Sequence, residues 1–219
     1  MNRSEQSAVR LTAQPLLITT RCSGGCAPCP FASGRLPQKY MTCADVLNHL
    51  KASTAPLVVI TGGEPFEHPH VEEILTELAQ VSTPFRIATG GHIALSDSIA
   101  RLHRSKGFQG ISLGTDVLSD LSEHCREHTL TWKRNIRILE KNKIRYSLSL
   151  TLNPDFNAFD VLQTALNCGA QPEFIYLRIP VTGASSRLPH SRSAYHSTLV
   201  DFIRRRWKNI EIIEDILAS

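Results

Sequence analysis

The chain has 219 residues and a mass of 24.3 kDa, with 42% hydrophobic and 20% charged residues, which excludes a disordered or collagen-like protein. Its net charge of +4 and pI near 8.8 mildly favour anionic partners without indicating a specific nucleic acid. The longest purely apolar runs, such as residues 57–60, are too short to span a membrane. Residues 1–14 form a polar extension without the features of a secretion signal, so we expect a cytoplasmic protein.

Hydrophobic periodicity predicts strands that alternate with helices along the chain. The predicted strands cover residues 15–20, 57–60, 85–89, 111–113, 145–151 and 173–179. The predicted helices follow at about 44–53, 70–81, 97–106, 130–143, 157–168 and 193–208. We expect one domain over residues 15–209 and a short tail over 210–219, because no change in composition marks a second domain.

This alternation of strand and helix predicts an α/β fold with parallel strands joined by right-handed crossovers. The sheet is then either an open doubly wound one or an incomplete (β/α) barrel, and periodicity does not choose between them. In both architectures the carboxyl ends of the strands and the loops after them form the functional site.

The loop after the first predicted strand holds three closely spaced cysteines, Cys22, Cys26 and Cys29, in a C-x3-C-x2-C pattern. Gly24 and Gly25 let this loop curl, so three thiolates can converge on one inorganic centre. A four-iron cluster held in this way keeps one iron without a protein ligand. A reducing compartment disfavours the alternative that these cysteines form disulfides.

Two other interpretations of the triplet remain open. One is a structural zinc site completed by Cys43 or a histidine, although no second C-x2-C half is present. The other is a set of unrelated buried thiols, which describes Cys43, Cys125 and Cys168 better than the triplet.

The second predicted strand runs directly into the turn Thr61-Gly-Gly-Glu-Pro65. Taken alone, this segment is equally consistent with a tight turn whose glycines adopt positive φ. Next to the cysteine loop it has a further interpretation, because glycines let a ligand approach the backbone and a carboxylate accepts hydrogen bonds from a ligand ammonium.

Together, the two motifs and their order resemble the radical S-adenosylmethionine (SAM) superfamily over residues 15–180. The resemblance implies a partial (β/α)6 barrel of parallel strands. It implies that Cys22, Cys26 and Cys29 ligate a [4Fe-4S] cluster whose fourth iron chelates SAM. It further implies that the turn binds the methionyl amine through residues Gly62, Gly63, Glu64 and Pro65. The expected chemistry is reductive cleavage of SAM to a 5′-deoxyadenosyl radical that abstracts a substrate hydrogen, with an electron donor such as flavodoxin or ferredoxin.

The resemblance also assigns polar residues at later strand ends to the SAM ribose and carboxylate. These are Thr89, Ser112, Ser149, Thr151 and Asn153. Each is equally explained as a cap of its strand or turn. Arg178 is expected to pair with the SAM carboxylate or a substrate acid, with a structural ion pair as the alternative, and residues 179–184 resemble the family's segment near the adenine.

The sequence departs from the family pattern in two respects. Pro28 stands before the third cysteine, where the family commonly has an aromatic residue, and the first aromatic is Phe31. No further cysteine run is present, so we expect no auxiliary clusters of the SPASM or twitch type.

We expect a peptide or protein substrate, as in peptide-modifying or glycyl-radical-activating members, because an incomplete barrel with no appended domain leaves its side open. A small metabolite is the alternative. His124, Cys125 and His128 lie at spacings that bind a metal if helical, although their acidic neighbours favour a solvated face. Cys125 is also a candidate hydrogen-atom donor to a substrate radical. From other classes, a zinc- or cluster-stabilised binding protein without turnover remains open.

Overall fold

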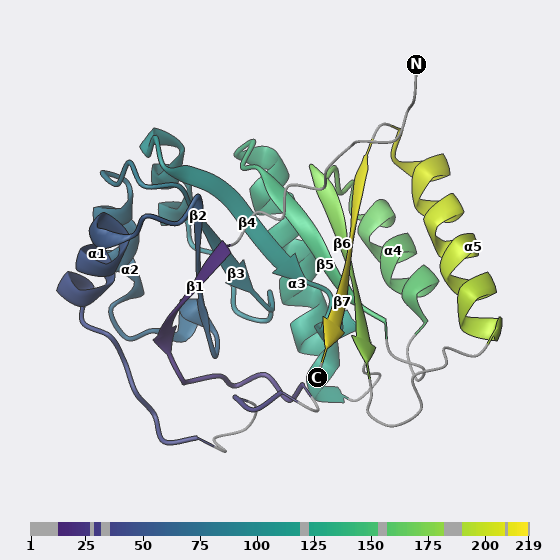
Figure 1. The fold of residues 1–219 in the computed structure, drawn as a ribbon, viewed down its shortest axis with the longest axis horizontal. Coiled ribbons are helices and arrows are strands. Elements are labelled where there is room, and N and C mark those ends of the chain that lie inside the picture. Colours follow the sequence, from purple (N-terminus) through teal and green to yellow (C-terminus); the bar gives the residue numbers. More distant parts are fainter. Residues whose placement is uncertain are drawn as a thin grey trace.

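Seven parallel strands form one sheet in which neighbours in space are also neighbours in sequence, from β1 at one edge to β7 at the other (Figure 1). The computed structural model describes residues 13–26, 29–31, 36–118, 123–152, 157–181, 190–208 and 210–218. The strands are β1 (Ala13–Thr19), β2 (Leu57–Gly62), β3 (Phe85–Thr89), β4 (Phe108–Gly114), β5 (Tyr146–Thr151), β6 (Phe174–Val181) and β7 (Glu211–Ala218).

Helices connect successive strands, as parallel pairing requires. The α-helices are α1 (Cys43–Ala52), α2 (Val71–Leu78), α3 (Glu123–Lys141), α4 (Ala158–Asn167) and α5 (His190–Arg206). The 3-10 helices are η2 (Pro65–Glu67), η3 (Asp97–Arg104) and η4 (Asp116–Leu118). Side-chain caps fix two helix starts, since Thr42 accepts the Asp45 N–H at 3.1 Å and Asn157 accepts the Phe159 N–H at 3.1 Å.

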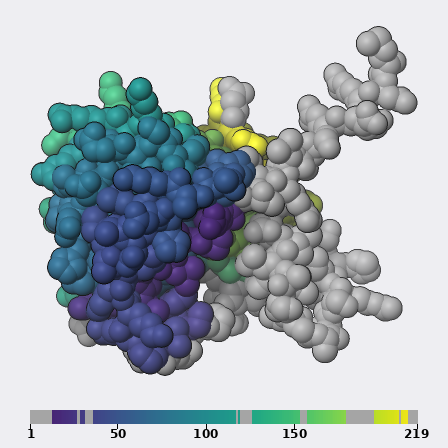
Figure 2. All heavy atoms as spheres, turned by 60° about the vertical axis from the view of Figure 1, so that its left-hand side comes forward, coloured from purple at the N-terminus to yellow at the C-terminus, as the bar shows by residue number. Residues whose placement is uncertain are grey.

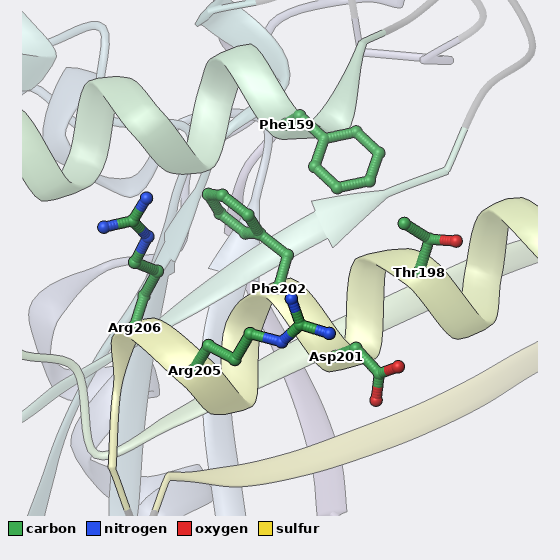
Figure 3. A pocket seen from close by; sticks show the side chains of 6 residues that line it. All are labelled: Phe159, Thr198, Asp201, Phe202, Arg205 and Arg206. Atoms are coloured by element: carbon green, nitrogen blue, oxygen red, sulfur yellow. The ribbon is translucent and has the colours of Figure 1, made fainter.

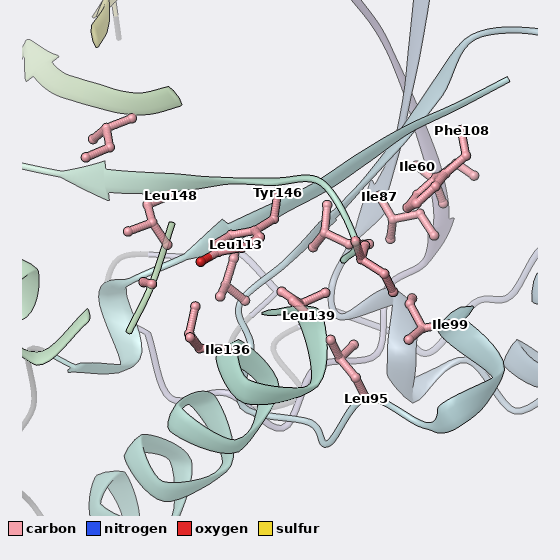
Figure 4. Packing of buried hydrophobic residues seen from close by; sticks show 14 of the residues in the cluster. Ile60, Ile87, Leu95, Ile99, Phe108, Leu113, Ile136, Leu139, Tyr146 and Leu148 are labelled. Atoms are coloured by element: carbon pink, nitrogen blue, oxygen red, sulfur yellow. The ribbon is translucent and has the colours of Figure 1, made fainter. Parts of the chain in front are cut away.

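One face of the sheet packs against the helices and forms the hydrophobic core. Figure 4 shows Ile136 and Leu139 of α3 beside Leu113 and Leu148 of the sheet, and all four side chains are fully buried. Burial of this apolar area is the main favourable term in folding.

The opposite face of the sheet carries small and polar side chains in one row across the strands. Leu17 pairs in register with Thr61, and Ala88 pairs with Ser112, which in turn pairs with Ser147. These residues alternate with core residues along their strands, so they point away from the helices. Thr61, Ala88 and Ser112 are half-buried and Leu17 is 48% exposed, whereas Ser147 is buried. The row is therefore open to a ligand from β1 to β4 and closed at β5.

The sheet confirms the predicted α/β class and is consistent with a partial (β/α) barrel. It has one strand more than the six that the periodicity indicated, because Glu211–Ala218 continues the parallel sheet beside β6. β1 begins at Ala13, two residues earlier than expected. The segment after β3 is a 3-10 helix, η3, where the sequence pattern indicated an ordinary helix. Within the described residues, no helix is both long and apolar enough to cross a membrane.

Candidate functional site

The two sequence motifs meet at the carboxyl ends of the neighbouring strands β1 and β2. The N–H of Gly63 donates to the Thr19 carbonyl at 2.8 Å, and the N–H of Glu64 donates to the Arg21 carbonyl at 2.7 Å. The start of the cysteine loop is therefore held against the glycine turn by main-chain hydrogen bonds. In Figure 2 the purple atoms of the first described residues reach the molecular surface.

Both glycines of the turn are required by the close approach of this loop. Gly62 has a φ of 137°, and a Cβ there would lie 2.2 Å from the Thr19 carbonyl oxygen. A Cβ on Gly63 would lie 2.1 Å from the Arg21 carbonyl oxygen. Any larger residue would push the two loops apart, so the glycines set their spacing.

Glu64 lies completely buried at the centre of the site. Its Oε1 accepts the Thr89 hydroxyl at 2.8 Å and the Phe66 N–H at 3.1 Å, and its Oε2 accepts the Gly90 N–H at 2.9 Å. Burial raises the pKa of this carboxyl, and the hydrogen bonds together with His92 oppose that rise. The side chain joins β2, η2 and the end of β3.

Glu67, which the sequence analysis did not single out, anchors the cysteine loop. Its Oε1 accepts the Ser23 N–H at 2.6 Å and the Ser23 hydroxyl at 2.7 Å, while its Oε2 accepts Nε–H of Arg21 at 3.2 Å. Burial raises the pKa of Glu67, but the hydrogen bonds from Ser23 and His92 outweigh it and leave the pKa below its ordinary value. Glu67 is therefore a carboxylate that accepts four hydrogen bonds.

His92 was also not predicted, and it lies between the two carboxylates. Its Nε2 is 3.1 Å from Glu67 Oε1, and its Nδ1 is 3.7 Å from Glu64 Oε2. The ring is buried, with its centroid 5.1 Å from that of His128 on α3. The only feature of the sequence that could have marked His92 as a site residue is its position directly after Gly90-Gly91, at the end of a predicted strand.

The three motif cysteines are half-buried and not disulfide-bonded. The Cys29 N–H donates to the Cys26 carbonyl at 2.9 Å, which turns the loop back between these two residues. Burial, followed by the nearby carboxylates Glu64 and Glu67, raises the pKa of the Cys22 thiol to about 12. Such a thiol ionises when it binds a metal, since the cation offsets both effects. Reduced thiols on one turning loop fit the donor set of an iron-sulfur cluster.

The remaining predicted residues lie in different surroundings. Thr89 is buried, and its hydroxyl donates a hydrogen bond to Glu64. Ser112 Oγ accepts from Ser147 at 3.4 Å on the open row, whereas Ser149 is buried and its carbonyl accepts both Thr115 N–H and Oγ1–H.

Arg178 is exposed within β6, in register with Thr151 at the end of β5, and Thr151 hydrogen-bonds to Asp116. Asn153 and residues 182–184 of the expected adenine segment lie outside the described residues. Cys125 lies on α3, but its side chain is also outside the described part.

A separate hollow of about 440 Å³ lies between α4 and α5, in the helix layer (Figure 3). Phe159 and Phe202 meet edge to face across it, with ring centroids 5.4 Å apart. Arg205 and Arg206 complete its rim. Neither motif contributes a residue to this hollow.

The chain belongs to the radical SAM superfamily, because residues 16–166 match the family model of that name. The matched segment contains both motifs and strands β2 to β5, with most of β1. This family uses a [4Fe-4S] cluster and SAM as its cofactors.

A GTP 3′,8-cyclase from Microcystis aeruginosa is 30% identical over 109 residues, which cover 46% of this chain and 33% of the cyclase. SuiB from Streptococcus suis has a similar fold. Its structure bound to S-adenosylmethionine matches with a TM-score of 0.66 and 14% identity, over 93% of this chain and 50% of SuiB. Its structure bound to the precursor peptide SuiA matches with a TM-score of 0.69 and 13% identity, over 93% of this chain and 48% of SuiB. The chain thus spans about a third to a half of the length of these proteins.

Proposed function

We propose that this chain is a radical SAM enzyme that modifies a peptide or protein. The observation that carries the proposal is the pair of main-chain hydrogen bonds from Gly63 and Glu64 to the cysteine loop. These bonds hold the start of the cysteine loop next to the glycine turn, at the carboxyl ends of β1 and β2. Parallel α/β folds place their functional sites at this end of the sheet.

In this proposal Cys22, Cys26 and Cys29 hold the [4Fe-4S] cluster. When bound, the cluster and SAM supply a 5′-deoxyadenosyl radical that abstracts a hydrogen atom from the substrate. Glu67 orders the first part of the loop through Ser23 and Arg21. The protein's contribution is to hold its ligands in place and to exclude water.

The glycine turn and the open row of the sheet provide the path for SAM and substrate. We assign the methionyl amine of SAM to the turn formed by Gly62, Gly63, Glu64 and Pro65. Glu64 is buried, and it supports the turn through its hydrogen bonds to Thr89 and Gly90. The row through Thr61, Ala88 and Ser112 leads from the turn towards β5. We assign Thr89, Ser112, Ser149 and Asn153 to the ribose and carboxylate region.

Arg178 is assigned to a carboxylate of SAM or of the substrate. Its guanidinium is exposed beside the Thr151–Asp116 pair, so an anionic group can reach it from solvent. An electron donor such as flavodoxin or ferredoxin would supply the reducing electron.

A peptide substrate is supported by the edge of the sheet next to the cysteine loop. Within the described part of the chain, residues 39–41 form main-chain hydrogen bonds with Ile18 and Thr20, and so cover only the carboxyl end of β1. The outer edge before these residues faces no other described strand, and Leu17 exposes an apolar side chain beside it. An extended peptide can add to such an edge by main-chain hydrogen bonds. The fold similarity to SuiB, which was solved with a precursor peptide, agrees with this assignment.

A small metabolite is the second candidate, and the sequence similarity to a GTP 3′,8-cyclase favours it. The half-buried polar row would suit a compact polar ligand as well as a peptide side chain.

The activity is tested by incubating the anaerobically reconstituted chain with SAM and a strong reductant. We expect 5′-deoxyadenosine by liquid chromatography and mass spectrometry, and none from the Cys26→Ala variant. Mass spectrometry of candidate peptides and metabolites after the same reaction then separates the two substrate classes. A brown, iron-loaded protein that binds SAM but forms no 5′-deoxyadenosine would contradict the proposal and indicate a non-catalytic accessory protein.

Cys125 is assigned as a hydrogen-atom donor to the substrate radical. Cys125→Ala should leave SAM cleavage intact and change the product. An unchanged product would remove Cys125 from the mechanism.

A further inference from the structure

Three side chains of different metal-binding classes converge beside the glycine turn. One ligand atom each from Cys22, Glu67 and His92 lies within 4.8 Å of the other two. The side chain of His92 is 2% exposed and that of Glu67 is 7% exposed, so water screens the group poorly. The residues come from three segments: the cysteine loop, η2 and the loop after β3.

The charges around this group favour a cation. Glu67 is a carboxylate 3.1 Å from His92 Nε2, and the buried carboxyl of Glu64 lies 3.7 Å from His92 Nδ1. The positive partner in a direct ion pair with Glu67 Oε2 is Arg21, whose side chain is 50% exposed and thus well solvated. Buried negative groups are stable only when paired or bound to a metal.

His92 provides an independent sign that a partner is missing. Its Nδ1 is buried and has no hydrogen-bond partner among the described residues. A buried polar atom without a partner is costly, and native structures rarely tolerate it without a role. The imidazole nitrogen on the Glu67 side is Nε2, which lies 3.1 Å from Glu67 Oε1 and is the one that can share an ion with Glu67. A metal on Nε2 keeps the proton on Nδ1, which then points to Glu64 Oε2 at 3.7 Å, the usual outer carboxylate partner of a metal-bound imidazole.

The backbone leaves room at the same place. A Cβ on Gly24 would lie 3.1 Å from His92 Cε1, 3.3 Å from Cys22 Sγ and 3.4 Å from His92 Nδ1. The thiol and the imidazole therefore face the same small space, and glycine is the residue that keeps this space open.

We propose that Cys22, Glu67 and His92 form a mononuclear site for a divalent transition-metal ion in the protein that carries no cluster. Thiolate, imidazole and carboxylate are the ligands that Fe²⁺, Co²⁺ and Zn²⁺ share, and a thiolate disfavours Mg²⁺ and Ca²⁺. Binding transfers the Cys22 thiol proton to solvent and forms the metal–sulfur bond, with no change of oxidation state. The site uses only one of the three motif cysteines, so it does not depend on the proposed enzymatic function.

The test is a titration of the full-length, metal-free, reduced protein with Co²⁺ under anaerobic conditions. We expect one equivalent to bind with a thiolate-to-cobalt charge-transfer band and the visible bands of a tetrahedral ion. Cys22→Ala should abolish the charge-transfer band. His92→Asn and Glu67→Gln should each weaken binding about tenfold or more. Zn²⁺ should displace the cobalt and bleach the colour.

Matched controls separate this site from the cluster site. Cys26→Ala and Cys29→Ala should retain the cobalt spectrum and affinity although they cannot assemble a cluster. His70→Asn, at an exposed histidine close in sequence, should behave as the parent. Gly24→Ala keeps all three ligands but fills their common space, so it should weaken cobalt binding.

The inference is overturned if Cys26→Ala or Cys29→Ala removes the cobalt spectrum, or if His92→Asn binds with parental affinity. It is also overturned if the parent binds no cobalt. Far-UV circular dichroism of each variant verifies that it is folded. Failure of the enzymatic proposal gives a different result, because cobalt binding would persist while no 5′-deoxyadenosine forms.

Discussion

The hydroxyl of Thr89 donates to Oε1 of Glu64 at 2.8 Å, which connects the end of β3 to the turn that follows β2. The same hydroxyl accepts the Gly91 N–H at 3.0 Å, so a single Thr side chain orders two loops of the site. Both Thr89 and Glu64 are buried, and water cannot replace either bond.

Thr89→Val should therefore destabilise the protein while keeping its shape. The substitution leaves the buried Glu64 with one donor fewer and Gly91 without its acceptor, which costs about 1–3 kcal/mol. Urea denaturation measures this loss. Thr54→Val, at an exposed threonine before β2, should change the free energy of unfolding by less than about 0.5 kcal/mol. Equal stability of the two variants would contradict the role of Thr89.

Gly63→Ala should separate the glycine turn from the cysteine loop. The new Cβ would meet the Arg21 carbonyl oxygen at 2.1 Å, so the Gly63 and Glu64 main-chain bonds must lengthen. We expect a loss of roughly 2 kcal/mol or more in the free energy of unfolding and weaker SAM binding by calorimetry. Gly25→Ala is the matched control, because nothing lies within 4 Å of its Cβ position. Parental SAM affinity in Gly63→Ala would exclude the turn from the SAM site.

Alanine at Cys22, Cys26 or Cys29 should abolish cluster assembly. Each variant removes one of the three expected iron ligands, and the remaining two cannot hold a four-iron cluster. Iron and sulfide analysis and the brown visible absorption after anaerobic reconstitution measure the outcome. Cys43→Ala and Cys168→Ala, at cysteines packed against the hydrophobic core, should load iron normally. Full iron content in any of the three motif variants would refute the ligand assignment.

His68 should make the stability of the fold depend on pH. Its Nε2–H donates to the Met41 carbonyl at 2.9 Å and its Nδ1 accepts the His70 N–H at 3.1 Å, so the neutral ring is fully bonded. Burial lowers the pKa of His68 from its ordinary 6.5. Below pH 6.5 the unfolded chain takes up the proton first, and the free energy of unfolding falls as the pH falls towards the folded-state pKa.

Unfolding experiments between pH 5 and 8 measure this dependence. His68→Gln should lower stability at pH 8 and flatten the decline below pH 6.5. His70→Gln should keep most of the decline, because burial is the main cause of the low His68 pKa and the His70 ring is the smallest named one, while the main-chain N–H of residue 70 still donates to His68. An unchanged pH profile in His68→Gln would show that another group causes it.

Local patterns predicted the fold and the motif residues because their signals lie within short segments. The apolar run at residues 57–60 and the alternation at 145–151 each indicated a strand, and the spacing of the cysteines indicated the metal-binding loop. Glu67 and His92 escaped prediction because their partners are distant in the chain. Ser23 and Glu67 are 44 residues apart, and His92 and Glu67 are 25 apart. A glutamate on a short 3-10 turn has no local feature that distinguishes it from an exposed one.

The seventh strand was missed for a related reason. Residues 211–218 are rich in isoleucine, but acidic residues interrupt them, and their pairing depends on the edge that β6 offers. The 3-10 helix η3 packs against α2, a contact that its own residues do not predict. Tertiary context decides such elements.

The two hydrogen bonds that hold the cysteine loop to the glycine turn involve only main-chain atoms of Thr19, Arg21, Gly63 and Glu64. On the loop side, the acceptors are carbonyl groups that every amino acid possesses. Substitution at position 19 or 21 therefore leaves these two acceptors in place, but it removes the Thr19 hydroxyl that accepts the Arg21 N–H or the guanidinium that pairs with Glu67. The two glycines thus set the spacing of the loops, and the side chains of Thr19 and Arg21 set how firmly the cysteine loop is held at that spacing.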